Sequence, residues 1–196
     1  MQGLWYGDRR DRVKWGALIH LAKTRAITRI VQVAYYRDGT DPILETPEGR
    51  VPMPVQVWEH FSDLRNIERL ARATDTSIVV LDQPFQPLHR PEYIASVVHR
   101  LTVVHSPKIV FLDPDTGIEP SAADPEHVAK TDLERIWAAL LPNDVLAVYQ
   151  HADHTGTWLH ERARKMTEAC GGMPVHSILG PGIASDVAML WCAKQS

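Results

Sequence analysis

Little cysteine, no long apolar run and no excess of positive charge mark this 196-residue sequence, and each deficit argues against a class of protein. Its two cysteines, Cys170 and Cys192, lack the spacing of a zinc site and are too few for a disulfide framework, which is typical of thiols in a reducing cytoplasm. No apolar run approaches the roughly 20 residues of a membrane span, so we expect no association with a membrane. The opening residues lack a basic segment followed by an apolar stretch, so we expect no signal peptide and a cytoplasmic location.

The charge and the glycine pattern exclude further classes. A net charge of −3 argues against a strongly electrostatic, sequence-independent DNA-binding protein, although it allows a locally basic groove. Neither G-x-G-x-x-G nor G-x-x-x-x-G-K-[ST] occurs, so the dinucleotide fingerprint and the P-loop are both absent. Trp5 and Trp15 flank a basic cluster and could stack on a base or ring. That cluster and the basic residues after it are Arg9, Arg10, Arg12, Lys14, Lys23, Arg25 and Arg29.

Apolar segments alternate with segments of helical periodicity, which predicts one α/β domain over residues 1–196. We expect a Rossmann-like, mostly parallel sheet with helices on both faces and a closing antiparallel hairpin. The segment through Glu48-Gly49 is either irregular or a short hairpin. The predicted strands are 27–36, 77–81, 109–112, 145–149, 174–179 and 187–193, and the predicted helices are 8–24, 55–74, 91–104, 133–140 and 157–169.

The central stretch is an apolar run, Ile109–Leu112, that ends abruptly in Asp-Pro-Asp-Thr-Gly. In an open α/β sheet, ligands bind in the crevice at the carboxyl ends of the strands. Asp113, Asp115 and Glu119 are therefore the best candidates for chemistry, and Asp82 follows a second apolar strand in the same way. The alternative is a sharp turn in which the polar side chains satisfy backbone amides.

The opening helix carries a second set of candidates. Asp8 is well placed as the N-cap, and Asp11 resembles the acidic partner of a capping box. Asp11 and Lys14 lie three residues apart on one helix face and could simply pair there. Alternatively, Gly7 lets a ligand approach the helix start, where the two aspartates would oppose an anion unless a metal ion lies between them.

A third set follows the strand at 145–149. His151, with Asp153 and His154, could bind a transition metal, or it could act as a general base. Tyr149 at the strand end is either a core residue or part of the site. Lys130 follows the acidic loop and either binds a phosphate or carboxylate or is a solvated side chain.

Three segments together resemble a family of uncharacterised bacterial proteins. These segments are Gly7-Asp8-x-x-Asp11-x-x-Lys14-Trp15, Leu112-Asp113-Pro114-Asp115-Thr116-Gly117 and Tyr149-Gln150-His151. The resemblance spans most of the chain and brings no established activity. It implies that the three segments form one site.

A looser resemblance is to class I S-adenosylmethionine methyltransferases that modify adenine amino groups. There a strand ends in Asp-Pro-Pro-Tyr and the sheet finishes with an antiparallel hairpin, and Asp113-Pro114 and the closing hairpin are similar. The opening helix with Asp11 and Lys14 is faintly similar. The sequence departs from this family at Asp115-Thr116, which replaces the Pro-Tyr that holds the base, and it lacks a glycine-rich loop after the first strand.

Three functional hypotheses follow, and the first is favoured because acidic residues end several strands. It is a metal-dependent phosphoesterase or nuclease acting on a nucleotide or nucleic acid, with catalytic Asp113, Asp115, His151 and Lys14. The second is a methyltransferase-like protein that binds S-adenosylmethionine and acts on nucleic acid. The third is a non-catalytic module that engages a partner through a patch containing Trp5 or Trp15. In the first, Mg²⁺ or Mn²⁺ would be held by Asp8, Asp11, Asp113, Asp115 and Glu119, and Lys130, Tyr149 and Trp15 would contact the bound group.

Overall fold

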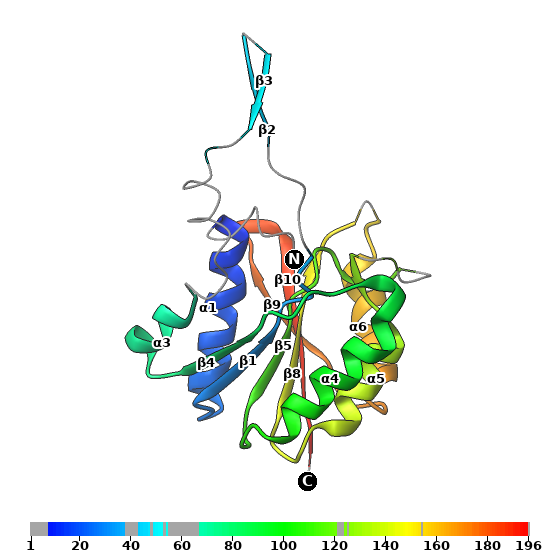
Figure 1. Cartoon of the computed structure of the whole chain (residues 1–196). Helices are drawn as coiled ribbons and strands as arrows, with labels where there is room; N and C mark the ends of the chain where they lie inside the picture. The colour runs from blue at the N-terminus through cyan, green and yellow to red at the C-terminus, as the bar shows by residue number, and fades with distance from the viewer. Residues whose placement is uncertain are drawn as a thin grey trace.

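A six-stranded sheet runs through the centre of the computed structural model, which describes residues 8–37, 43–47, 49–52, 54, 67–120, 124, 126–153 and 155–195 (Figure 1). The first four strands in the sheet are parallel, and the fifth is antiparallel to both of its neighbours. In sheet order the strands are β4 (Ser77–Leu81), β1 (Arg29–Val33), β5 (Ile109–Leu112), β8 (Val145–His151), β10 (Ala184–Ala193) and β9 (His176–Gly180).

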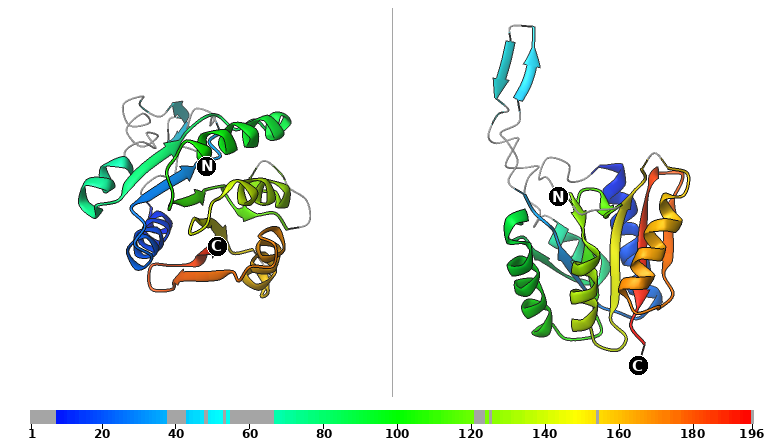
Figure 2. Two further views of the ribbon diagram at one scale, coloured as in Figure 1. Left: turned by 90° about the horizontal axis from the view of Figure 1, so that it is seen from below. Right: turned by 90° about the vertical axis from the view of Figure 1, so that its right-hand side faces the viewer.

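Helices cover both faces of this sheet, which confirms the predicted Rossmann-like α/β fold (Figures 1 and 2). On one face lie α1 (Arg9–Thr24) and α3 (Glu68–Thr74). On the other lie α4 (Arg90–Thr102), α5 (Lys130–Ala139) and α6 (Trp158–Ala169), with a short 3₁₀ turn, η3 (Pro87–His89), before α4. The predicted C-terminal hairpin is the pair β9 and β10, with β10 inserted between β8 and β9.

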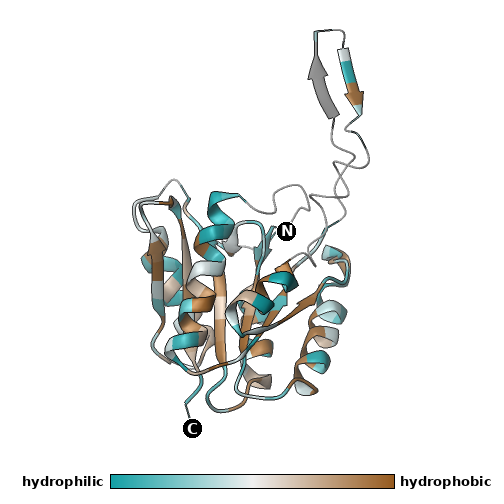
Figure 3. Ribbon diagram, turned by 90° about the vertical axis from the view of Figure 1, so that its left-hand side faces the viewer, coloured by the Kyte–Doolittle hydropathy of each residue, from teal (hydrophilic) through white to brown (hydrophobic). Residues whose placement is uncertain are grey.

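The core divides between the two faces because neighbouring residues on a strand point to opposite sides. In β1, Val31 and Val33 pack among the residues of α4, α5 and α6, whereas Ile30 packs with α1. All four residues of β5 are fully buried, as a strand covered on both faces requires. Each such side chain contributes about 1.5–3 kcal/mol by leaving water. Figure 3 shows the apolar strands between helices whose outer surfaces are hydrophilic.

Two smaller strand pairs accompany the main sheet. The strands β2 (Ile43–Thr46) and β3 (Gly49–Pro52) form an antiparallel pair, so of the two alternatives for this segment the short hairpin is the one observed. The pair lies away from the main sheet in Figure 2. The parallel pair β6 (Gly117–Ile118) and β7 (His127–Val128) was not predicted, because two-residue strands leave no periodicity in the sequence.

Some predictions fall outside the described residues. Of the predicted helix 55–74 only 67–74 is described, and it contains α3. Trp5, Gly7 and His154 also lie outside the described part of the chain. Within that part, no helix combines the length and the apolar character that crossing a bilayer requires.

The connectivity places a switch point between β1 and β5. From β1 the chain passes to β4 on one side, and it then returns to form β5 on the other side. Ligands of open α/β sheets bind at such a point, outside the carboxyl ends of the strands. Asp82 and Asp113 follow β4 and β5, which flank β1, so the two aspartates lie on either side of β1.

Candidate functional site

A buried ion pair joins the opening helix to the central loop at the carboxyl end of β5. Lys14 Nζ lies 3.0 Å from Asp113 Oδ1 and 3.2 Å from Asp11 Oδ1. Asp113 is completely buried, and Lys14 and Asp11 are nearly so. The pairing of Lys14 with Asp11 on one helix face is confirmed. The contact with Asp113 also shows that the opening helix reaches the central loop, on which a single site depends.

The pKa values of Lys14 and Asp113 are both shifted, because the two side chains are buried next to each other. Burial alone would lower the pKa of Lys14, but the carboxylates of Asp113 and Asp11 raise it well above its ordinary value. Burial raises the pKa of Asp113, and the ammonium of Lys14 opposes that shift. Lys14 is therefore a permanent cation, which compensates one of the two carboxylates beside it.

Gln32 on β1 completes this buried group, although it was not among the predicted site residues. Its Nε2 donates to Asp113 Oδ2 at 2.8 Å, across the switch point. Its Oε1 is buried and has no hydrogen-bond partner among the described residues. The sequence does contain a sign of this role for Gln32. An amide side chain inside the strand Arg-Ile-Val-Gln-Val is a polar group where apolar residues are expected.

A pocket of about 320 Å³ lies over this ion pair, between the start of α1 and the carboxyl ends of β5 and β8. Tyr149 lines it, and Lys14 Nζ lies 4.1 Å from the centroid of the Tyr149 ring. Burial raises the pKa of Tyr149, so its phenol is neutral and can donate a hydrogen bond at pH 7. Tyr149 is thus both a packed side chain and part of the pocket wall.

His151 lies in the same wall with both ring nitrogens close to oxygens. Nδ1 lies 2.9 Å from the carbonyl oxygen of Ala152, and Nε2 lies 3.4 Å from Asp186 Oδ2. Arg10 holds the same Asp186 oxygen, with its Nε at 3.0 Å. Both ring nitrogens of His151 therefore face oxygen atoms, and the ring lines the pocket.

The loop after β5 turns as its sequence predicts. The guanidinium of Arg37 pairs with Asp115 at the pocket wall. Gly117 adopts φ +117°, and a Cβ there would lie 2.4 Å from Gln150 Oε1. That oxygen accepts a hydrogen bond from Ile118 N at 2.8 Å. The glycine therefore allows both the turn and the close approach of the Gln150 side chain.

Three predicted site residues lie away from the pocket. Trp15 is buried in the core, with its ring edge-on to Phe111 at 5.9 Å between centroids, so it is a packing residue rather than a stacking surface. Glu119 accepts a hydrogen bond from the backbone N of Lys130 at 2.9 Å, at the start of α5. The Lys130 ammonium pairs with Glu168 on α6 at 3.0 Å.

The predicted magnesium or manganese site does not form, since its carboxylates are already engaged by other groups. Asp8 is the N-cap of α1, as predicted, and accepts hydrogen bonds from Arg10 N and Asp11 N at 2.7 and 2.9 Å. Asp11 and Asp113 share Lys14, and Asp115 is paired with Arg37. Among the residues with described positions, no group of three histidine, cysteine, aspartate or glutamate side chains could hold a metal ion.

Comparisons with known proteins complete this description. No family model matches the chain, and no curated protein matches it by sequence. The chain is similar to a putative methyltransferase from Thermobifida fusca YX, with 13% identity over 96% of this chain and 81% of that one and a TM-score of 0.45. It is also similar to a release factor-specific protein-(glutamine-N5) methyltransferase from Alicyclobacillus acidocaldarius, with 13% identity over 97% and 95% of the two chains and a TM-score of 0.46. A third similar structure is the N-methyltransferase NodS from Bradyrhizobium japonicum WM9, with 10% identity over 98% and 100% of the two chains and a TM-score of 0.41.

These findings overturn the favoured hypothesis from the sequence. The carboxylates expected to hold a metal are used as a helix cap and in ion pairs, and no group of three possible metal ligands forms among the described residues. The prediction of a metal-dependent phosphoesterase or nuclease is wrong. It failed because carboxylates spaced for a metal are equally suited to hold lysine and arginine side chains.

Proposed function

We propose that this protein is an S-adenosylmethionine-dependent methyltransferase whose site lies at the carboxyl edge of β4, β1, β5 and β8. One observation carries the proposal: Asp113-Pro114 ends β5 directly beside the switch point and lies next to a polar pocket. The insertion of antiparallel β10 between β8 and β9 agrees with the methyltransferase resemblance of the closing hairpin.

The charge of the pocket suits a sulfonium cofactor. Four carboxylate residues line it against two permanent cations, so the wall carries an excess of negative charge. A positively charged sulfonium is favoured in such a surrounding, whereas a phosphate is not. The carboxylates are Asp8, Asp11, Asp115 and Glu126, and the cations are Arg10 and Lys14.

Residues on β1 and β4 fit the rest of the cofactor. Asp82 directly follows β4, where a carboxylate in Rossmann-like sheets binds ribose hydroxyls. The chain has no glycine-rich loop after β1, but Tyr35 adopts φ +47°, a sharp turn of the kind that glycine usually provides. Gln32 Oε1, which has no hydrogen-bond partner in the described part of the chain, is an acceptor suited to an ammonium group such as that of the methionine portion.

The cofactor supplies an electrophilic methyl group, and the protein has to orient an acceptor toward it. In our proposal Asp82 binds the ribose, and the Lys14–Asp113 pair keeps the loop after β5 in place. The neutral Tyr149 phenol and the His151 ring, both in the pocket wall, would hydrogen-bond the acceptor and hold it in position. We propose a nitrogen acceptor on a nucleic acid or a protein, because the resemblance at Asp113-Pro114 is to amino-group methyltransferases.

Calorimetric titration with S-adenosylmethionine tests the cofactor directly, without any acceptor. We expect saturable binding to the full chain, weakened roughly 10- to 100-fold in Asp82→Asn, because hydrogen bonds to a charged group contribute about 1.5–3 kcal/mol. The control Glu92→Gln changes an exposed carboxylate on α4 and should bind as the unaltered chain does.

Transfer of a radioactive methyl group to total RNA, DNA or protein then identifies the acceptor class. Failure of the unaltered chain to bind either S-adenosylmethionine or S-adenosylhomocysteine would refute the proposal. It would favour the non-catalytic module instead.

A further inference from the structure

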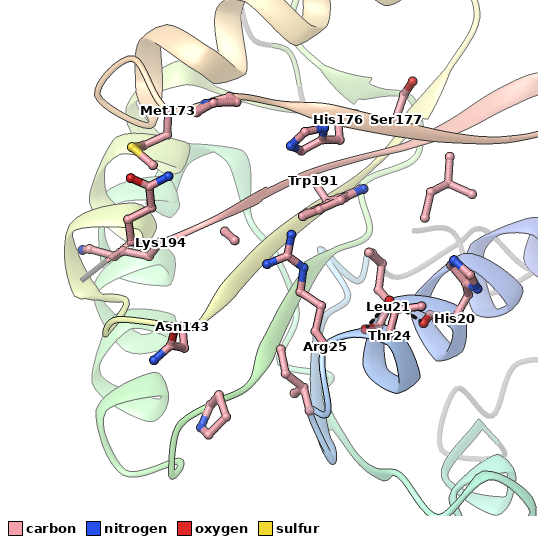
Figure 4. A pocket seen from close by; sticks show the side chains of 16 residues that line it. His20, Leu21, Thr24, Arg25, Asn143, Met173, His176, Ser177, Trp191 and Lys194 are labelled. Atoms are coloured by element: carbon pink, nitrogen blue, oxygen red, sulfur yellow. Dashed lines mark hydrogen bonds between the residues drawn. The ribbon is translucent and has the colours of Figure 1, made fainter.

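A second pocket, of about 1060 Å³, lies at the opposite edge of the sheet from the candidate methyltransferase site (Figure 4). Its walls are the C-terminal turn of α1, the turns before β5 and β8, and the strands β9 and β10. None of its lining residues takes part in the proposed methyl transfer. Its volume is slightly above the range of roughly 300–1,000 Å³ for small-molecule pockets, and it is open to solvent.

This pocket is basic in a chain that is acidic overall. His20, Arg25, His176 and Lys194 line it, and the described lining residues include no aspartate or glutamate. The C-terminal end of α1 is the negative end of its dipole, and Lys23 in the last turn and Arg25 at the C-cap offset it. The pocket therefore attracts an anion, in contrast to the carboxylate-rich pocket at the other edge.

Its centre is a stack of three planar groups. Trp191 on β10 is paired in register with His176 on β9, and their rings stack with centroids 4.6 Å apart and 27° between planes. Arg25 is the C-cap of α1, and its guanidinium carbon lies 4.5 Å from the centroid of the Trp191 ring (Figure 4). Because His176 and Arg25 are exposed while Trp191 is half-buried, the stack presents a planar group to solvent.

We propose that this second pocket binds single-stranded nucleic acid. A base would extend the stack on the imidazole of His176, and a neighbouring phosphate would pair with Arg25 and His20. Proteins that bind single strands combine an electropositive groove with aromatic platforms and arginine stacking, and this pocket has all three. The polar groups of Asn143 and Ser177 at its rim can hydrogen-bond bases or sugars. A polymer fits the open shape better than a free nucleotide, which would occupy part of the volume.

The test is fluorescence anisotropy with a labelled oligothymidylate of about 12 nucleotides, measured without S-adenosylmethionine so that the result does not depend on the proposed methyl transfer. We expect His176→Ala to weaken binding at least about fivefold, because base stacking contributes about 1–3 kcal/mol per base. The control His99→Ala removes an exposed histidine from α4 and should leave the affinity unchanged.

Salt dependence separates the phosphate contact from stacking. A plot of log affinity against log salt should lose about 0.7 in slope in Arg25→Ala, the value for one phosphate contact on a single strand. The control Arg72→Ala removes an exposed arginine from α3 and should keep the full slope.

Three results would overturn the proposal. The first is absence of binding to the unaltered chain at low salt, and the second is binding by both His176→Ala and Arg25→Ala as tight as that of the unaltered chain. The third is binding of thymidine monophosphate as tight as that of the oligonucleotide, which would make the ligand a free nucleotide.

Discussion

The strand β5 has a buried lysine–aspartate pair at each end, and the two pairs differ in how completely they are satisfied. At its amino end, Lys108 Nζ lies 2.8 Å from Asp144 Oδ2, and both side chains are almost wholly buried. Asp144 also accepts hydrogen bonds from Lys108 N and Leu141 N, each at 3.0 Å. At its carboxyl end, Lys14 is shared by two carboxylates and the adjoining Gln32 Oε1 lacks a described partner.

This difference indicates that the Lys108–Asp144 pair has a structural role. Asp144 is fully used in joining the turn before β8 to the start of β5, and it borders neither of the two described pockets. Lys14 lines a pocket at the edge where ligands of α/β sheets bind. We therefore infer a structural role for the Lys108–Asp144 pair, whereas the role of the Lys14–Asp113 pair beside a ligand stays our proposal.

Among the substitutions that test this comparison, Asp144→Ala should have the largest effect on stability. We expect it to lower the free energy of unfolding by about 3–5 kcal/mol, because it leaves the Lys108 ammonium buried without its carboxylate. Urea unfolding followed by circular dichroism measures this loss. A double variant, Lys108→Met with Asp144→Leu, should recover part of the loss, because it removes the buried ammonium but leaves the backbone N–H groups of residues 108 and 141 without their acceptor. A loss below about 1 kcal/mol in the single variant would contradict the structural role.

Gly117→Ala is expected to have the next largest effect, at the carboxyl end. The new Cβ would collide with the Gln150 side chain, and φ +117° strains any other residue, so we expect a loss of about 2–3 kcal/mol. The control is Gly156→Ala, where a Cβ meets nothing within 4 Å. Equal unfolding midpoints for the two variants would show that the loop after β5 adapts freely.

Asp113→Asn tests whether the aspartate at the carboxyl end of β5 contributes less to stability than Asp144 does. We expect a loss of only about 1–2 kcal/mol in urea unfolding, because Lys14 keeps Asp11 as a partner at 3.2 Å and lines an open pocket. A loss as large as that of Asp144→Ala would mean that both pairs are equally structural.

Asp186→Asn should have the smallest effect, and that effect should depend on pH. The hydrogen bond from Arg10 lowers the pKa of Asp186, so its carboxylate stabilises the fold above the unfolded pKa of about 3.9, and this contribution is lost as the pH falls through the folded pKa. The variant should lose less than about 1 kcal/mol at pH 7, since the pair is partly exposed. Urea midpoints of the two proteins should converge below about pH 4, and a constant difference would contradict this account.

Much of the fold was predictable because its signals are local. The strands 77–81 and 109–112 were predicted with their observed bounds, and the helix at 8–24 differs from α1 by one residue, its cap Asp8. The closing hairpin followed from two apolar segments around Gly180-Pro181-Gly182. These features depend on periodicity, caps and turn residues within a few positions of one another.

The meeting of the three motif segments was predictable, but the partners of their side chains were not. The three motif segments meet at Lys14, Asp113 and Tyr149. That they form one functional site, as the resemblance to the uncharacterised family implied, stays a prediction. The partners that decide the chemistry, Arg37 and Asp186, come from distant segments without any motif. A sequence shows that a carboxylate follows a strand, but it does not show which cation will neutralise it.

The sequence by itself determined the alternation of strands and helices, and it also determined that polar residues end the buried strands. Hydrophobic periodicity and chain breakers act over short distances, so they can be recognised without the fold. Only the tertiary structure decided that the acidic residues hold lysine and arginine instead of a metal ion. It also brought Arg25, His176 and Trp191 into one stack, because contacts between distant segments depend on how the sheet orders its strands and on which edge each side chain reaches.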